Sequence, residues 1–135
     1  MIPNNDSWLP AAGRLGLSLI FIAGGVGKLA NVAGTVQYMT AFGVPAAGLL
    51  VWPTILLELG GGLLLLAGFQ ARLVALAIIA FTALATVLFH GFWAMPADQV
   101  MVNQIMFFKN LGLIGGLAYV VAYGPGRWSV DARRA

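Results

Sequence analysis

The sequence contains no cysteine and only one histidine, His90. The absence of cysteine excludes a disulfide framework, a thiolate metal site and thiol redox chemistry within the chain. A single histidine also argues against a zinc site or a bis-histidine haem site built by this chain alone. We therefore predict no metal site and no covalently bound cofactor.

Charged side chains are scarce as well. Seven Lys and Arg and four Asp and Glu account for 8% of the 135 residues, whereas 61% are hydrophobic. Soluble domains carry about 25% charged residues, so this chain has too few to cover a soluble surface, and its mean hydropathy of +0.94 agrees. The net charge of +3 is small and forms no patch of the kind that binds nucleic acid. The composition predicts an integral membrane protein whose main surroundings are lipid.

Four apolar segments are long enough to cross a bilayer, which takes about 20 residues of helix. The first lacks the basic start and the clear cleavage site of a signal peptide, so we expect it to be retained. The sequence therefore predicts an all-α, up-down bundle of four transmembrane helices that forms one domain over residues 1–135, with a short amphipathic helix in the first connection, around 35–42. The predicted spans run over about 9–30, 46–68, 71–93 and 102–123.

An even number of spans places both termini on the same side of the membrane. Five arginines lie on or near that side, and the two lysines lie toward the other. Because basic residues accumulate in cytoplasmic segments, we predict that both termini are cytoplasmic. The arginines are Arg14, Arg72, Arg127, Arg133 and Arg134.

The polar residues within the spans recur at helical spacing, so those of each span share one face of their helix. Glycines fall on the same faces, where membrane helices approach closely. Ionisable groups inside a membrane usually face the bundle interior and pair there. Glu58 is the carboxylate of this polar seam, and we expect its counter-ion to be Lys109, Arg14 or both. The seam comprises Arg14, Ser18, Lys28, Thr54, Glu58, Thr82, Thr86, His90 and Lys109.

Three basic side chains of the outer half, Lys28, His90 and Lys109, outnumber the one carboxylate, so spare hydrogen-bond donors should remain after Glu58 is paired. We predict a small polar pocket there that can bind a ligand, lined by Lys28, Glu58, His90, Lys109 and Asn110. The competing interpretation is structural: an ion pair among Arg14, Glu58 and Lys109 that fixes helix register, with His90 satisfied near the interface and Asn110 bonded across helices.

Four stretches of the sequence resemble, in order, the four helices of the DoxX family of bacterial membrane proteins. They are 14–28, 58–68, 89–92 and 107–117, the last containing the pair Lys109-Asn110. The resemblance implies a multi-pass protein of the bacterial plasma (inner) membrane. Some members of that group are linked to thiosulfate:quinone oxidoreductases or to oxidative and sulfur stress.

Three functions stay open at this point. The first is a membrane subunit of a quinone-linked redox system, with quinone as the ligand and the electron carriers on a partner, because no residue here carries electrons. The second is a non-catalytic anchor, assembly or accessory subunit of a larger complex, in which the polar seam is structural. The third, a small transporter or proton path, has little room in four helices. A protein partner or a homo-oligomer is expected in the first two cases.

Overall fold

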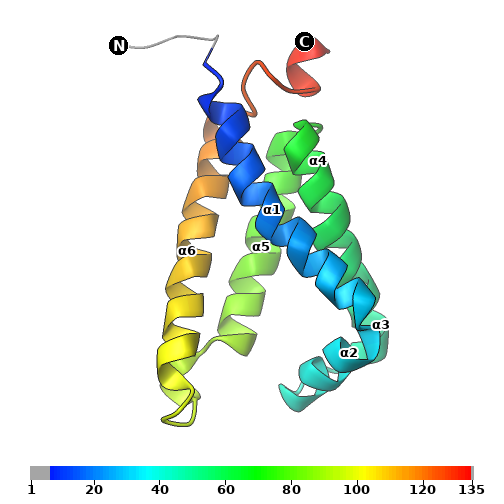
Figure 1. The fold of residues 1–135 in the computed structure, drawn as a ribbon, viewed down its shortest axis with the longest axis vertical. Coiled ribbons are helices and arrows are strands. Elements are labelled where there is room, and N and C mark those ends of the chain that lie inside the picture. Colours follow the sequence, from blue (N-terminus) through cyan, green and yellow to red (C-terminus); the bar gives the residue numbers. More distant parts are fainter. Residues whose placement is uncertain (1–6, 135) are drawn as a thin grey trace.

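The computed structural model describes residues 7–134, and every regular element in that range is helical. Four helical segments are long and apolar enough to cross a membrane: 9–30, 47–67, 71–94 and 100–123. They run up and down in chain order, and the first and last described residues lie at the same end of the molecule (Figure 1). The all-α, four-span prediction is therefore confirmed, while the side of the membrane that the termini face stays a prediction. The α-helices are α1 Leu9–Ala30, α2 Val32–Ala41, α3 Ala47–Ile55, α4 Gly61–Ala67, α5 Ala71–Phe89 and α6 Val100–Tyr123.

The second span is not one continuous α-helix. A π-helical turn, Leu56–Gly60, joins α3 to α4, and Pro53 lies just before it. Proline has no amide hydrogen and disturbs the regular hydrogen bonding of a helix. Single π-helical turns inside α-helices occur frequently at functional sites, and Glu58 is the central residue of this one.

Glycines let α1 cross the second span at close range. A Cβ on Gly25 would lie 2.7 Å from the Cβ of Leu59, and a Cβ on Gly62 would lie 2.8 Å from Cγ1 of Ile22. These two glycines therefore act as the packing residues that the sequence predicts. Gly112 of α6 does not, because nothing lies within 4 Å of its Cβ position.

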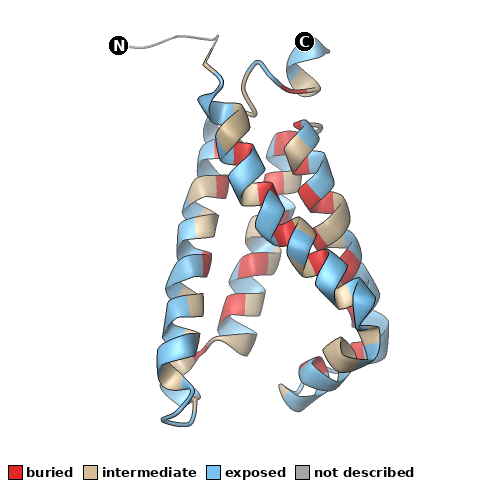
Figure 2. Cartoon of the chain, in the orientation of Figure 1, coloured by how far each residue is buried: buried red, intermediate tan, exposed pale blue. Residues whose placement is uncertain are grey.

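The helices are packed tightly near the termini and diverge at the opposite end, which we call the distal half. The main core lies in the terminal half, around Phe21, Leu65, Ile78 and Leu117. In the distal half, α5 stays with α6, while α2 folds back beside α3 (Figure 1). A second core of Met39, Ala47, Val51 and Ile55 joins α2 to α3. Buried residues in Figure 2 accordingly line the inner faces of helices that are otherwise exposed.

The C-terminal segment is folded onto the terminal end of the bundle. The carboxylate of Asp131 accepts hydrogen bonds from the backbone N–H of Gln70 (2.8 Å) and of Ala71 (2.9 Å). The Val130 N–H donates to the carbonyl oxygen of Ala67 at 3.0 Å. Asp131 therefore satisfies two amides at the start of α5, where negative charge is also favoured by the helix dipole.

Candidate functional site

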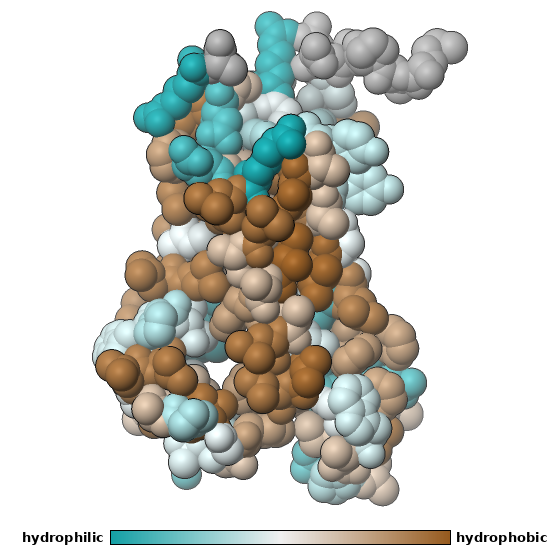
Figure 3. Space-filling model, turned by 180° about the vertical axis from the view of Figure 1, so that it is seen from behind, coloured by the Kyte–Doolittle hydropathy of each residue, from teal (hydrophilic) through white to brown (hydrophobic). Residues whose placement is uncertain are grey.

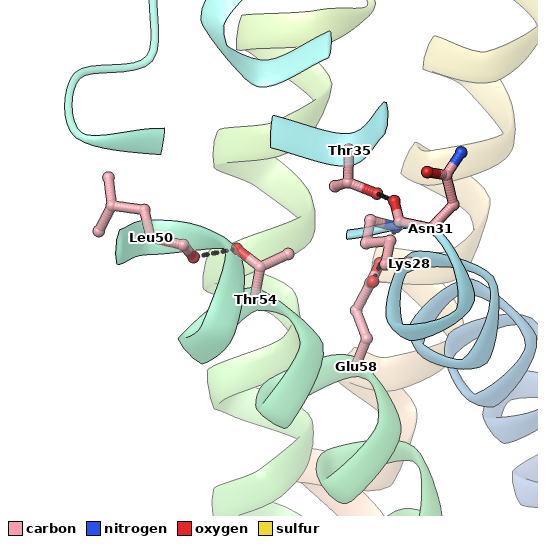
Figure 4. Close-up of polar contacts among 6 residues, drawn as sticks. All are labelled: Lys28, Asn31, Thr35, Leu50, Thr54 and Glu58. Atoms are coloured by element: carbon pink, nitrogen blue, oxygen red, sulfur yellow. Dashed lines mark hydrogen bonds and ion pairs between the residues drawn. The ribbon is translucent and has the colours of Figure 1, made fainter. Parts of the chain in front are cut away.

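Glu58 forms an ion pair with Lys28, the basic residue in the last turn of α1. The Lys28 Nζ and the Glu58 Oε2 are 2.8 Å apart, and the two side chains point toward one another (Figure 4). Glu58 is buried at 8% exposure, whereas the Lys28 side chain is 32% exposed. A Cβ on Gly24 would lie 3.4 Å from the Glu58 Oε1, so this glycine leaves room for the carboxylate against α1.

The prediction that Arg14 or Lys109 pairs with Glu58 is wrong. Arg14 is buried and donates to backbone carbonyl oxygens instead: its Nε to Pro125 (2.9 Å), and its terminal nitrogens to Leu65 (3.1 Å), Leu66 (2.6 Å) and Trp128. The physical reason is depth. Arg14 and Lys28 are separated by about 21 Å of helix, and α1 crosses the second span where Gly25 meets Leu59, which places Glu58 near Lys28.

Lys109 has no carboxylate partner within residues 7–134. Its Nζ contacts the Sδ of Met106 at 3.4 Å, and thioether sulfur is only a weak acceptor. The side chain is exposed on α6 and borders the cavity described below. The Lys109 ammonium group therefore keeps N–H donors that can form hydrogen bonds to an acceptor on a ligand.

Asn110 ties α6 to α5. Its Nδ2 donates to the Thr86 Oγ1 at 2.9 Å, and that hydroxyl donates in turn to the carbonyl oxygen of Thr82 at 2.6 Å. This is the cross-helix bond that the sequence predicts for Asn110. The Thr82 hydroxyl is buried and has no hydrogen-bond partner in the described part of the chain. It is a second polar group that is left unsatisfied beside the cavity.

His90 follows the last residue of α5 and is bonded to the start of α6. Its Nδ1 lies 3.0 Å from the Oδ1 of Asn103, whose Nδ2 donates to the Gln99 carbonyl oxygen. Because the Asn103 amide is oriented by that second bond, its Oδ1 must accept, and Nδ1 of His90 carries the hydrogen. In the neutral imidazole, Nε2 is then an acceptor. His90 can therefore donate to a ligand through Nε2 only when the ring is protonated.

One cavity of about 370 Å³ lies in the distal half, between α1, α2, α5 and α6 and the π-helical turn, and it is bordered by Lys28, Glu58, Thr82, His90, Lys109 and Asn110. All five residues of the predicted pocket lie on its wall. Of the aromatic residues that the sequence suggests beside a bound ring, Phe89 lines the cavity, whereas Phe92, Trp93, Phe107 and Phe108 do not. The sequence missed Phe21, Phe81 and the contribution of α2. Desolvation raises the pKa of the Tyr38 hydroxyl, which stays a protonated donor. The lining includes Phe21, Lys28, Thr35, Tyr38, Met39, Glu58, Phe81, Thr82, Phe89, His90, Lys109 and Asn110.

Comparison with known proteins gives a family and several relatives. The sequence profile of the family described as DoxX matches residues 9–91. The chain is 44% identical over 118 residues to inner membrane protein YqjF of Escherichia coli K12, which covers 87% of this chain and 85% of the relative. It is 35% identical over 120 residues to inner membrane protein YphA of the same organism, covering 89% and 86%. A Surfeit locus protein 4 homolog of Schizosaccharomyces pombe is 32% identical over 69 residues, covering 50% of this chain and 23% of that protein. No solved structure matches the chain.

Proposed function

The chain belongs to the DoxX family and is a small multi-pass protein of the inner membrane, and from that premise we propose that its distal cavity binds the ring of a quinone. In this proposal the protein is the quinone-binding membrane subunit of a redox system. Electrons pass through a flavin, haem or iron–sulfur centre of a partner, because this chain has no side chain that carries them.

The observation that carries the proposal is that Lys109 keeps free N–H donors, whereas Glu58 and Lys28 already pair with each other. Glu58 already has Lys28 at 2.8 Å, whereas within residues 7–134 Lys109 has only the Met106 sulfur. A quinone offers two carbonyl oxygens, one at each end of a flat ring, and an ammonium group is a strong donor to such an acceptor. The unpartnered Thr82 hydroxyl supplies a further polar contact on the same wall.

The rest of the wall suits an aromatic ring. Phe21, Phe81 and Phe89 line the cavity, and Phe89 also packs on Tyr38 with ring centroids 5.5 Å apart. A cavity of about 370 Å³ lies within the range of about 300–1,000 Å³ that is usual for small-molecule sites, which combine apolar walls with a few placed polar groups. The faces of a quinone ring match the aromatic walls, and its two oxygens match the donors.

Reduction of the ligand would change which protein groups it contacts. A hydroquinone carries hydroxyl groups, which donate, and the Nε2 of neutral His90 is an acceptor on the same cavity wall. Lys109 would donate a hydrogen bond to the oxidised ring, and neutral His90 would accept one from the reduced ring. The site therefore offers polar contacts to both redox states of one ligand.

Binding of a water-soluble quinone tests the proposal. We would titrate the purified protein in lipid nanodiscs with 2,3-dimethoxy-5-methyl-1,4-benzoquinone and measure the dissociation constant. Loss of a charge-assisted hydrogen bond costs about 1.5–3 kcal/mol, so Lys109→Met should weaken binding about 10- to 100-fold. Gln104→Ala, an exposed position on the same helix outside the cavity, is the matched control and should not change it.

Two results would contradict the proposal: no saturable binding by the unmodified protein, or equal binding by the Lys109→Met variant. The first result would favour the non-catalytic accessory subunit with purely structural polar groups. The second would show that Lys109 does not hold the quinone.

A further inference from the structure

A second cavity, of about 420 Å³, lies next to the polar one, between α3 and α5 and beneath the loop 42–45. The two cavities share a wall of Met39, Thr54, Phe81, Ala85 and Phe89. A ligand that occupies the polar cavity therefore lies directly against the second one.

The second cavity is lined almost wholly by apolar side chains. Among the described residues that line it, the one side-chain oxygen or nitrogen is the Thr54 Oγ1, which already donates to the Leu50 carbonyl oxygen at 3.0 Å (Figure 4). An ordered water needs two to four polar partners. Water is therefore a poor occupant of this cavity, and hydrocarbon is a good one.

The cavity also opens sideways toward lipid. Leu50 of α3 and Leu84 and Leu88 of α5 line it, and all three are exposed on the outer surface. In this half of the molecule α3 packs on α1 and α2, while α5 packs on α6. Figure 3, which shows the molecule from behind, has an opening in its lower part bordered by apolar side chains. A chain leaving the cavity between α3 and α5 would pass directly into the bilayer.

We propose that the ligand is an amphiphile with a flexible hydrocarbon chain, whose ring lies in the polar cavity and whose chain lies in the apolar one and reaches the lipid between α3 and α5. This inference rests on the proposed function and specifies its ligand as a membrane-borne quinone. The ligand then enters and leaves through the side of the protein and never crosses water.

The test compares two quinones that differ only in the chain. The dimethoxy-methyl benzoquinone and its decyl derivative are titrated against the same protein in nanodiscs, with concentrations expressed per lipid. Leu84→Trp, and separately Leu88→Trp, fills the apolar cavity without touching the polar one. Leu76→Trp, on the lipid-exposed surface of α5 outside both cavities, is the matched control.

We expect each cavity-filling variant to weaken binding of the decyl quinone at least tenfold, because the tryptophan occupies the space that the decyl chain would fill. The same variants should leave the chainless quinone within about twofold of the unmodified protein, and Leu76→Trp should change neither. Equal weakening of both quinones, or of neither, would overturn the inference while leaving the proposed function intact. If neither quinone binds the unmodified protein, the proposed function fails as well.

Discussion

Arg14→Met should release the C-terminal segment and destabilise the terminal half of the bundle. The Arg14 side chain is 2% exposed and donates to four carbonyl oxygens, two at the end of α4 and two in the C-terminal segment. Methionine preserves much of the apolar stem but none of these donors. The substitution therefore removes the group that holds three parts of the chain together.

The cost can be worked out bond by bond. A hydrogen bond to a charged group contributes about 1.5–3 kcal/mol, but not all four are lost at full value. The carbonyls of Pro125 and Trp128 can turn to water once the segment detaches, and the Leu65 carbonyl also accepts from the Gly68 N–H. Two costs remain: the Leu66 carbonyl is left without a donor, and the C-terminal segment no longer docks on the bundle. Removal of a buried charge offsets part of these costs. We expect a loss of about 3–4 kcal/mol.

Unfolding in mixed detergent micelles measures the stability, and trypsin cleavage after Arg127 measures release of the segment. Arg72→Met is the control, because Arg72 also donates to two carbonyls, at 2.9 and 3.2 Å, but is exposed and replaceable by water or headgroups. It should cost less than about 1 kcal/mol and leave cleavage unchanged. An Arg14→Met protein as stable and as resistant to trypsin as the control would refute the reasoning.

The ion pair and the topology give two further predictions. Lys28→Met should lower the free energy of unfolding by up to about 3 kcal/mol, because it leaves a buried carboxylate without its counter-ion. Glu58→Gln should cost less. The double variant Lys28→Met/Glu58→Gln should recover most of the loss caused by Lys28→Met in the same unfolding assay. If the losses of the two single variants simply add in the double variant, the two residues are not coupled. A reporter fused after Arg134 should be active only in its cytoplasmic form, because the arginines gather at the end that carries the termini. Activity of a periplasmic reporter there would reverse the orientation.

Composition and periodicity were enough to predict the fold. Hydrophobic segments of bilayer length specify four helices, and the spacing of Arg14, Ser18 and Phe21 correctly identifies the buried face of α1. The five pocket residues could also be grouped from their positions along the spans, although Glu58 lies near the middle of its span and the Lys109 side chain is exposed. Their role in binding a ligand stays a prediction.

The ion-pair partner could not be predicted from the same signals. Helical spacing says which face a residue occupies, but the depth at which two helices meet depends on their crossing. That crossing is set here by Gly25 and Gly62 and by the π-helical turn around Glu58. The position of α2 was missed for a similar reason. Nothing in its sequence says that it folds back to place Tyr38 and Met39 on the cavity wall.

The contacts of the C-terminal segment also constrain the order in which the protein can be completed during synthesis. Arg14 leaves the ribosome more than 100 residues before two of its acceptors, Pro125 and Trp128, and before Asp131, which caps α5. Until the chain has been made as far as Asp131, the guanidinium and the amides at the start of α5 lack their final partners. A chain that stops short of residue 125 leaves that buried arginine only partly satisfied, so incomplete products are less stable than the finished protein at that end.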